Sequence, residues 1–283
     1  ELVEAKCLIV RGDINCVDLA HIRNFGYAPD EHGNAPVKEL LDMSGCNIVD
    51  GESEEFGISE KDVLSGLGWI KCKDIRLPES IRAIGYSALS YVETRTVRIP
   101  DKVESIGIGA FAHSCVSEMD IPSTVKSMGR FVFWDCQQLR RISLPEMKEI
   151  PFGAFSGCAL EQVHIPEGVE IIGDGAFEGC RMLSELTLPR SLKKIGMSAF
   201  VSCESLKSLT VPEGIAEISE YAFGDNFLKS PLKELHYKAK EPCWIYGVTV
   251  VAGVEDCVLY VPRSSLSRFE VSGNWGFKDV VGE

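Results

Sequence analysis

The sequence predicts an α/β repeat solenoid: a right-handed array with a parallel sheet, about seven regular repeats of 21–23 residues, and irregular caps. Three observations predict this fold, and all three recur at one spacing, which is the signature of a repeat architecture. Each repeat has a short apolar run that ends in Pro, then an Ala-Phe pair or its equivalent, and in four copies a Cys. The prolines stand at positions 78, 100, 122, 145, 166, 189 and 212.

The run before each proline is expected to form a strand. In "SLTVP" (208–212), polar and apolar residues alternate, as they do in a strand with one buried face. Proline ends the strand because it has no N–H group to donate. One repeat buries too little apolar surface to fold alone, so the copies must stack. Their strands then pair in parallel, and the equivalent Phe and Ile side chains form two ladders.

A glycine follows the isoleucine of most repeats, and its exceptions are informative. Pro151 and Ser219 take its place in two copies. Proline holds φ at about −65°, so this position does not require a positive φ. We expect the small size of glycine to matter there.

The chain is predicted to form one continuous domain with three parts. These are an N-terminal cap with atypical repeats (1–70), the regular repeats (71–237) and a C-terminal capping turn (238–283). Atypical end units are expected because they cover the open ends of the core.

Each cap has its own predicted elements. In the N-terminal cap we expect a strand at 7–10, a helix at 15–25 and a second strand that enters a turn at 37–48. In the C-terminal cap we expect one more, irregular turn of the array, at 256–262. The end is then closed by Leu266, Phe269 and Trp275.

Composition excludes several classes of protein. The formal net charge of −13 argues against nucleic acid as a partner, because such binding needs a basic face. The longest apolar run, at 248–254, is far shorter than the roughly 18 residues of a membrane span, so no transmembrane segment is expected. The chain begins at Glu1 without Met, and we expect a mature or trimmed chain that lacks any signal or lipid-anchor segment.

The cysteine column raises three alternatives. It consists of Cys136, Cys158, Cys180 and Cys203, among eleven cysteines in all. Disulfides are disfavoured because parallel Cβ vectors hold ladder neighbours too far apart. A metal site is disfavoured because there is neither a C-x-x-C pair nor a mixed Cys/His cluster. We expect buried thiols that act as small apolar groups with a weak donor.

No motif predicts a cofactor or catalysis. The match to G-x-G-x-x-A at 107–112 belongs to a series of equivalent repeat corners and lacks the context of a dinucleotide loop. The five histidines are scattered over different turns and do not meet a Ser or Cys. The acidic segment at 50–62 lacks the spacing of a calcium loop, and we expect a solvated loop there.

The repeat resembles the BspA-like leucine-rich repeats of bacterial cell-surface proteins. It reads L-P-x-x-V-x-x-I-G-x-x-A-F-x-x-C-x-x-L-x-x-L-x-L over residues 71–237, and "LDMSGCNI" (41–48) is similar to a leucine-rich core with Cys46 in the Asn/Cys position. The resemblance implies a right-handed leucine-rich-repeat array. It also implies an extracellular location on the bacterial surface, often as a lipoprotein, with adhesion to host matrix proteins or other cells. It supplies no catalytic residues and no cofactor.

The exposed face of the sheet is the predicted binding surface. Its polar positions form columns, and four cations on two adjacent turns predict a local basic patch for an acidic protein ligand. An ordinary solvated face is the alternative. The candidate binding residues are Lys73, Arg76, Arg95, Arg98, Glu118, Asp120, Arg141 and His164.

A carbohydrate ligand is disfavoured on the sheet face because no aromatic column lies there. The sequence does not place Trp134, Trp244 and Tyr246. We therefore expect a non-catalytic, surface-exposed module that binds proteins, with host extracellular matrix or other cell-surface proteins as its ligands. A structural spacer in a larger surface assembly is the alternative. An enzyme that uses the acidic loop or the C-terminal turn is the least supported class.

Overall fold

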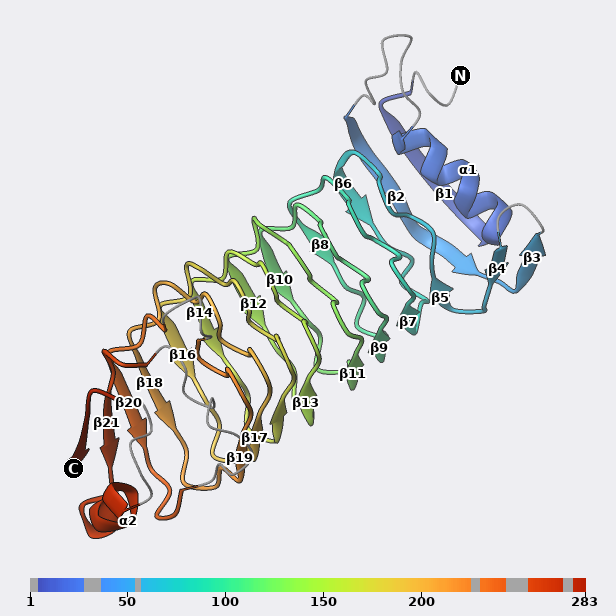
Figure 1. Ribbon diagram of the computed structural model, residues 1–283. Helices are drawn as coiled ribbons and strands as arrows, with labels where there is room; N and C mark the ends of the chain where they lie inside the picture. Colours follow the sequence, from blue (N-terminus) through green and yellow to red (C-terminus); the bar gives the residue numbers. More distant parts are fainter. Residues whose placement is uncertain (1–4, 28–36, 54–56, 225–229, 243–253, 272–276) are drawn as a thin grey trace. The chain divides into compact units, whose positions relative to one another are not determined.

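The computed structural model confirms a repeat solenoid with parallel sheets and little helix (Figure 1). By its internal contacts the chain divides into two compact units, Glu1–Pro145 (unit 1) and Glu146–Glu283 (unit 2). The predicted boundaries after residues 70 and 237 stay predictions. The structure describes residues 5–27, 37–53, 57–224, 230–242, 254–271 and 277–283.

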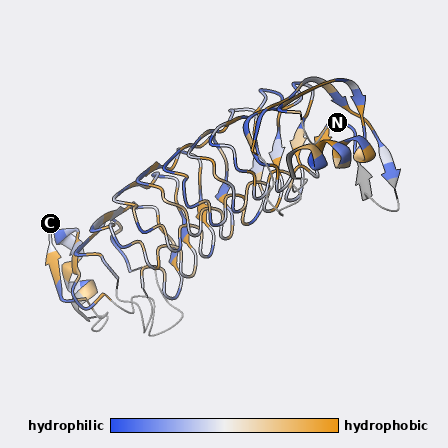
Figure 2. Ribbon diagram, turned by 90° about the horizontal axis from the view of Figure 1, so that it is seen from above, coloured by the Kyte–Doolittle hydropathy of each residue, from blue (hydrophilic) through white to orange (hydrophobic). Residues whose placement is uncertain are grey.

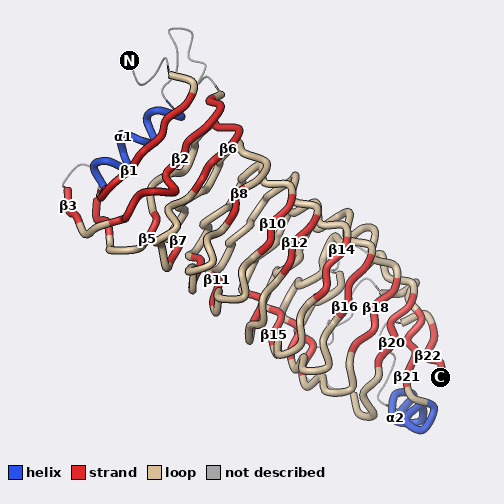
Figure 3. Tube along the Cα trace, turned by 180° about the vertical axis from the view of Figure 1, so that it is seen from behind, coloured by secondary structure: helices blue, strands red, loops and turns tan. Residues whose placement is uncertain are grey.

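Unit 1 contains two sets of parallel strands (Figure 3). The main strands run in the order β1-β2-β6-β8, followed by the pair β10-β12, and the short strands run in the order β5-β7-β9-β11. The main strands are β1 (Cys7–Ile14), β2 (Lys38–Ile48), β6 (Cys72–Arg76), β8 (Val97–Arg98), β10 (Glu118–Asp120) and β12 (Arg141–Ser143). The short strands are β5 (Val63–Leu64), β7 (Ala83–Ile84), β9 (Ser105–Ile106) and β11 (Ser127–Met128).

Unit 2 repeats this arrangement. Its main strands form the pair β14-β16 and the sheet β18-β20-β21-β22, and its short strands run β13-β15-β17-β19. The main strands are β14 (Gln162–His164), β16 (Glu185–Thr187), β18 (Ser208–Val211), β20 (Glu234–Tyr237), β21 (Val258–Val261) and β22 (Asp279–Gly282). The other elements are β13 (Glu149–Ile150), β15 (Ile171–Ile172), β17 (Lys194–Ile195), β19 (Glu217–Ile218), a 3-10 turn (Arg263–Ser265) and α2 (Leu266–Val271).

Alternation along the main strands sorts side chains into core and surface. On β10, Met119 is buried between the exposed Glu118 and Asp120. Met119 pairs in register with Ile142 of β12, so the apolar positions of neighbouring turns coincide. Figure 2 shows the resulting mixture of hydrophilic and hydrophobic residues along the turns of each unit.

The predicted ladders are present in the core. Successive Phe rings stack with centroid distances of 5.1 Å for Phe111–Phe133, and of 5.3 and 5.7 Å for Phe155–Phe177 and Phe177–Phe200. The Ile positions do more than the sequence predicted, because they form the two-residue short strands and so add a second parallel sheet. Both ladders are confirmed.

The cysteine column contributes hydrogen bonds inside the core. The Cys180 thiol donates to the carbonyl oxygen of Phe155 at 3.1 Å, and the Cys203 thiol donates to that of Phe177 at 3.2 Å. Each thiol therefore links its own repeat to the Phe of the repeat before it. This confirms the prediction of buried thiols with a weak donor role.

The glycine of each repeat corner sits where two turns approach closely. At Gly173 a Cβ atom would lie 2.7 Å from the backbone nitrogen of Phe152, and at Gly107 it would lie 2.7 Å from the carbonyl carbon of Gly85. Neither glycine has a positive φ. The prediction that size decides this position is confirmed.

The N-terminal cap has the predicted strand–helix–strand order. Helix α1 (Cys16–Tyr27) is capped by Asn15, whose side-chain oxygen accepts a hydrogen bond from the N–H of Val17 at 2.9 Å. The Asp18 carboxylate accepts the N–H of Asn15 in return, at 3.0 Å, which completes a capping box. The helix packs against β1 and buries Phe25.

One prediction for the caps needs correction. The acidic segment is not entirely a loop, because β3 (Gly51–Ser53) and β4 (Gly57–Ser59) pair as an antiparallel hairpin. The further turn predicted at 256–262 is present, because β21 pairs in parallel with β20, and β22 then pairs with β21 as an additional strand. The predicted closing residue Phe269 is fully buried, Leu266 is partly exposed, and Trp275 lies outside the described residues.

Candidate protein-binding surface

All eight predicted binding residues are exposed; seven of them lie on the main strands, and Arg95 lies in the bend just before β8. Seven of the eight belong to unit 1. The strand register places Arg76 opposite Arg98, and Glu118 opposite Arg141. The residues of each of these pairs are therefore adjacent on neighbouring strands, as the predicted columns require. The eighth residue, His164, lies on β14 of unit 2.

The predicted basic patch needs a correction, because acidic side chains neutralise three of its four cations. Their ion pairs are Lys73–Glu39 (2.8 Å), Arg76–Asp74 (3.2 Å), Arg98–Glu79 (2.8 Å) and Arg98–Asp101 (2.9 Å). Most of these carboxylates come from β2 and from loops after the strands, which the strand columns alone do not include. The face therefore presents paired, alternating charge. The role of its residues in binding stays a prediction.

A buried carboxylate supports this face from β2. The Asp42 side chain accepts hydrogen bonds from the Ser44 hydroxyl at 2.6 Å and from the Arg11 guanidinium at 3.1 Å. Arg76 lies 3.8 Å from the same carboxylate. The Ser44 hydrogen bonds, and then the Arg11 guanidinium, hold the pKa of Asp42 well below its usual range. Asp42 is thus an ionised anchor for the cations at this end of the sheet.

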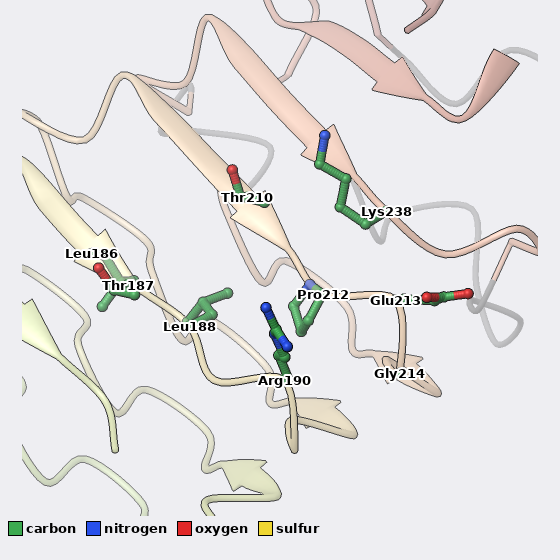
Figure 4. Close-up of a pocket in the computed structure, with 9 residues that line it drawn as sticks. All are labelled: Leu186, Thr187, Leu188, Arg190, Thr210, Pro212, Glu213, Gly214 and Lys238. Carbon is green, nitrogen blue, oxygen red and sulfur yellow. The ribbon is translucent and has the colours of Figure 1, made fainter. Parts of the chain in front are cut away.

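Unit 2 has an open pocket of about 730 Å³ at the ends of its main strands (Figure 4). Thr187 on β16 and Thr210 on β18 contribute hydroxyl groups, and Arg190 and Glu213 contribute charges from the following turns. The complete lining is Leu186, Thr187, Leu188, Arg190, Thr210, Pro212, Glu213, Gly214 and Lys238. The two threonines belong to the exposed strand positions that the sequence predicted. The loop residues beside them show no regular spacing in the sequence, so the sequence does not predict the pocket.

An ion-pair network borders this pocket. One carboxylate oxygen of Glu283 pairs with Lys238, and the other lies 3.0 Å from Nδ1 of His236. The Lys238 ammonium, and then His236, lower the pKa of Glu283. The C-terminal residue of the chain therefore ties β22 to the end of β20.

Unit 1 also carries an exposed aromatic stack that the sequence reasoning missed. The rings of Trp69 and Tyr91 stack at 3.8 Å, and those of Tyr91 and His113 at 4.4 Å. Trp134 meets His113 edge-on at 4.6 Å. A signal was available, because Trp69, Tyr91 and His113 are spaced by one repeat and the last two each follow the Phe position by two residues.

The thiols of the cysteine column are structural groups. Burial raises the pKa of the Cys180 thiol to about 12 and that of Cys203 well above its usual value, so neither thiol is an activated nucleophile. Within the described ranges, His, Cys, Asp and Glu side chains form no group of three that could hold a metal ion. None of the helices in this part of the chain has the length and apolar character that crossing a bilayer requires.

Comparison with known families identifies the repeat. Residues 68–150 and 148–238 match the family described as BspA type leucine rich repeat region, in six copies. The chain belongs to this family. The match covers the strands, corners and ladders described above, and the BspA-type repeats make up more than half of the chain.

Solved structures show the same fold. A leucine-rich repeat protein from Bacteroides ovatus is 21% identical, with a TM-score of 0.55, over 90% of this chain and 75% of that one. A leucine-rich repeat protein from Eubacterium ventriosum is 25% identical, with a TM-score of 0.53, over 67% of this chain and 51% of that one. The chain thus spans about half the length of the second protein. No curated protein matches the sequence significantly.

Proposed function

We propose that this chain is a non-catalytic binding module on the bacterial cell surface, and that the main sheet face of unit 1 binds a protein partner there. One observation carries the proposal: exposed charged residues lie in register on consecutive, hydrogen-bonded strands. Sites built on strands hold their side chains more firmly than sites on loops do. Leucine-rich repeats of this kind are generally protein-interaction or surface modules.

The chemistry of the face indicates the kind of partner. Cations and carboxylates alternate on this face. A partner with both acidic and basic groups can therefore replace the ion pairs within the face by ion pairs across the interface. Acidic groups of the partner would meet Arg76 and Arg98, and basic groups would meet Glu118 and Asp120. Host extracellular matrix proteins are the partners that we propose. Because the charges are exposed, binding should weaken as salt screens them.

A structural spacer remains the second candidate function. Stacked repeats separate the two ends of a unit whether or not one face binds anything. A spacer needs no particular side chains on its exposed face. The two functions therefore differ in whether an isolated chain recognises a partner.

The test is label-free binding of the purified chain to a panel of host matrix proteins, at low and at high salt. Saturable binding that weakens at high salt supports the adhesive function. No binding to any protein of the panel would overturn the choice of matrix proteins and favour the spacer. Binding that salt leaves unchanged would show that the charged face is not the contact surface.

A further inference from the structure

The exposed aromatic stack of unit 1 has a geometry that core packing does not explain. Trp69 is 51% exposed, Tyr91 is 36% exposed and Trp134 is 43% exposed. Burial of apolar area stabilises a fold, and these rings contribute only part of the stabilisation that full burial would give. The stack is held together by ring contacts between successive repeats, at 3.8 and 4.4 Å.

The backbone under the stack adopts a conformation that disfavours side chains. Trp69, Tyr91 and His113 have φ values of 71°, 58° and 58°, in the left-handed region that suits glycine. Later repeats keep the positive φ at the equivalent position with smaller residues, namely Asp135 (φ 55°), Gly157 (φ 76°), Gly179 (φ 70°) and Ser202 (φ 59°). Unit 1 therefore has large rings at positions where the fold does not require a large side chain. Such strain is concentrated at functional sites.

Trp69 offers an open aromatic face. Tyr91 stacks on one side of its indole ring in a nearly parallel arrangement, with an interplanar angle of 5°. No other ring among the described residues stacks on Trp69, although about half of this residue is exposed. One flat face of the indole is therefore open to solvent and backed by a rigid stack.

Polar groups lie next to this aromatic surface along the chain. Within the described part of the chain, no acceptor takes a hydrogen bond from the Trp69 or Trp134 ring N–H or from the Tyr91 hydroxyl. Two residues after Trp69 and Tyr91 in the chain stand Lys71 and Glu93, which form an exposed ion pair at 2.8 Å. The surface thus combines a flat apolar face with unused donors and nearby acceptors.

We propose that the exposed aromatic stack is a binding site for neutral carbohydrate, with a sugar ring stacked on the open face of Trp69. One face of a pyranose presents C–H groups, whose partial positive charge suits the negative face of an aromatic ring. The sugar hydroxyls need both donors and acceptors at the rim, and both are present.

The same observations define which sugars fit. The chain carries a net charge of −13, and Glu93 lies near the site, so uronic and sialic acids are disfavoured. The stacked rings precede the main strands of their repeats and are not part of them, and the site does not depend on the protein-binding function proposed above. It also revises the expectation from the sequence, which disfavoured carbohydrate because no aromatic column lies on the sheet face.

The test is isothermal titration calorimetry of the full chain with short neutral oligomers of glucose, mannose, galactose and N-acetylglucosamine. Wild-type protein should bind at least one of them saturably. Trp69→Gly should weaken that binding at least tenfold, and it should still fold because glycine suits a φ of 71°. Circular dichroism melting curves check the fold of each variant.

Tyr86→Ala is the matched control. Tyr86 is an aromatic residue of the same unit, is 74% exposed and forms no part of the stack, so its variant should bind like the wild type. Failure of the wild type to bind any of the oligomers would overturn the proposal. Equal binding by a folded Trp69→Gly variant would do the same. If that variant instead loses only a protein partner, the stack is a protein contact and the carbohydrate assignment is wrong.

Discussion

The thiols of the cysteine column show how single residues serve the array. Cys180 is fully buried, donates to the Phe155 carbonyl at 3.1 Å, and has a pKa raised by burial to about 12. We therefore predict that alkylation of the native protein at neutral pH labels the exposed Cys7 quickly and Cys180 very slowly. After denaturation without reductant, nearly all eleven cysteines should be labelled, and mass spectrometry counts them. Two or more protected pairs would contradict the hydrogen-bonded column.

Asp42 makes a second prediction at the residue scale. Its pKa is lowered in the folded state, so its charge stabilises the fold above the unfolded carboxyl pKa of about 3.9, and this stability is lost as pH falls toward the folded pKa. Asp42→Asn should cost about 1–3 kcal/mol at neutral pH, and the difference should shrink in acid. Urea denaturation across pH measures it.

The control for Asp42 is Asp101→Asn. Asp101 pairs with Arg98 at 2.9 Å, but its side chain is largely exposed, so its loss should cost less than about 1 kcal/mol. Equal costs for the two variants, or a cost for Asp42→Asn that does not depend on pH, would contradict the role of Asp42 as a buried anchor.

At the scale of the element, the repeat corners set how closely two turns approach. Gly173→Ala places a Cβ 2.7 Å from the Phe152 nitrogen and 2.9 Å from the Ile150 carbonyl oxygen, and backbone atoms cannot move away cheaply. We predict a loss of about 1–3 kcal/mol in unfolding free energy, measured by chemical denaturation. At Gly214 the nearest atom is the flexible Lys193 ammonium, so Gly214→Ala should be nearly neutral. The reverse ranking would refute close approach as the reason for glycine.

The sequence predicts the regular elements well and the caps less well, for a physical reason. Because the repeats recur every 21–23 residues, equivalent positions of neighbouring copies pair in register. The repeat pattern therefore predicts that Met119 pairs with Ile142, as it does. The caps lack this repetition. The acidic segment has few apolar residues to reveal the β3–β4 hairpin. The β21 and β22 strands lie beyond the series of prolines that recur every 21–23 residues.

The candidate surfaces are harder to predict because they combine residues from different repeats and loops. The exposed columns follow from alternation, but the partners of Arg98 come from Glu79 and Asp101, outside the strands. Trp69 and Tyr91 both have a positive φ where their rings stack. A positive φ is common for glycine and uncommon for aromatic residues, so the sequence gives no sign of this geometry. The strand columns predicted a basic patch where the structure has ion pairs, because those columns omit the acidic residues of the loops.

For the molecule as a whole, the central claim is that the main sheet face of unit 1 recognises a protein partner. The most direct test compares the affinity of the Arg76→Glu/Arg98→Glu double variant with that of Lys193→Glu/Lys194→Glu, a control pair outside the proposed face, for the matrix protein that the wild type binds. We predict that reversal at Arg76 and Arg98 weakens binding at least tenfold, because like charges then face the partner's acidic groups. The control should bind as the wild type does. Equal affinities for the two folded variants would contradict the claim.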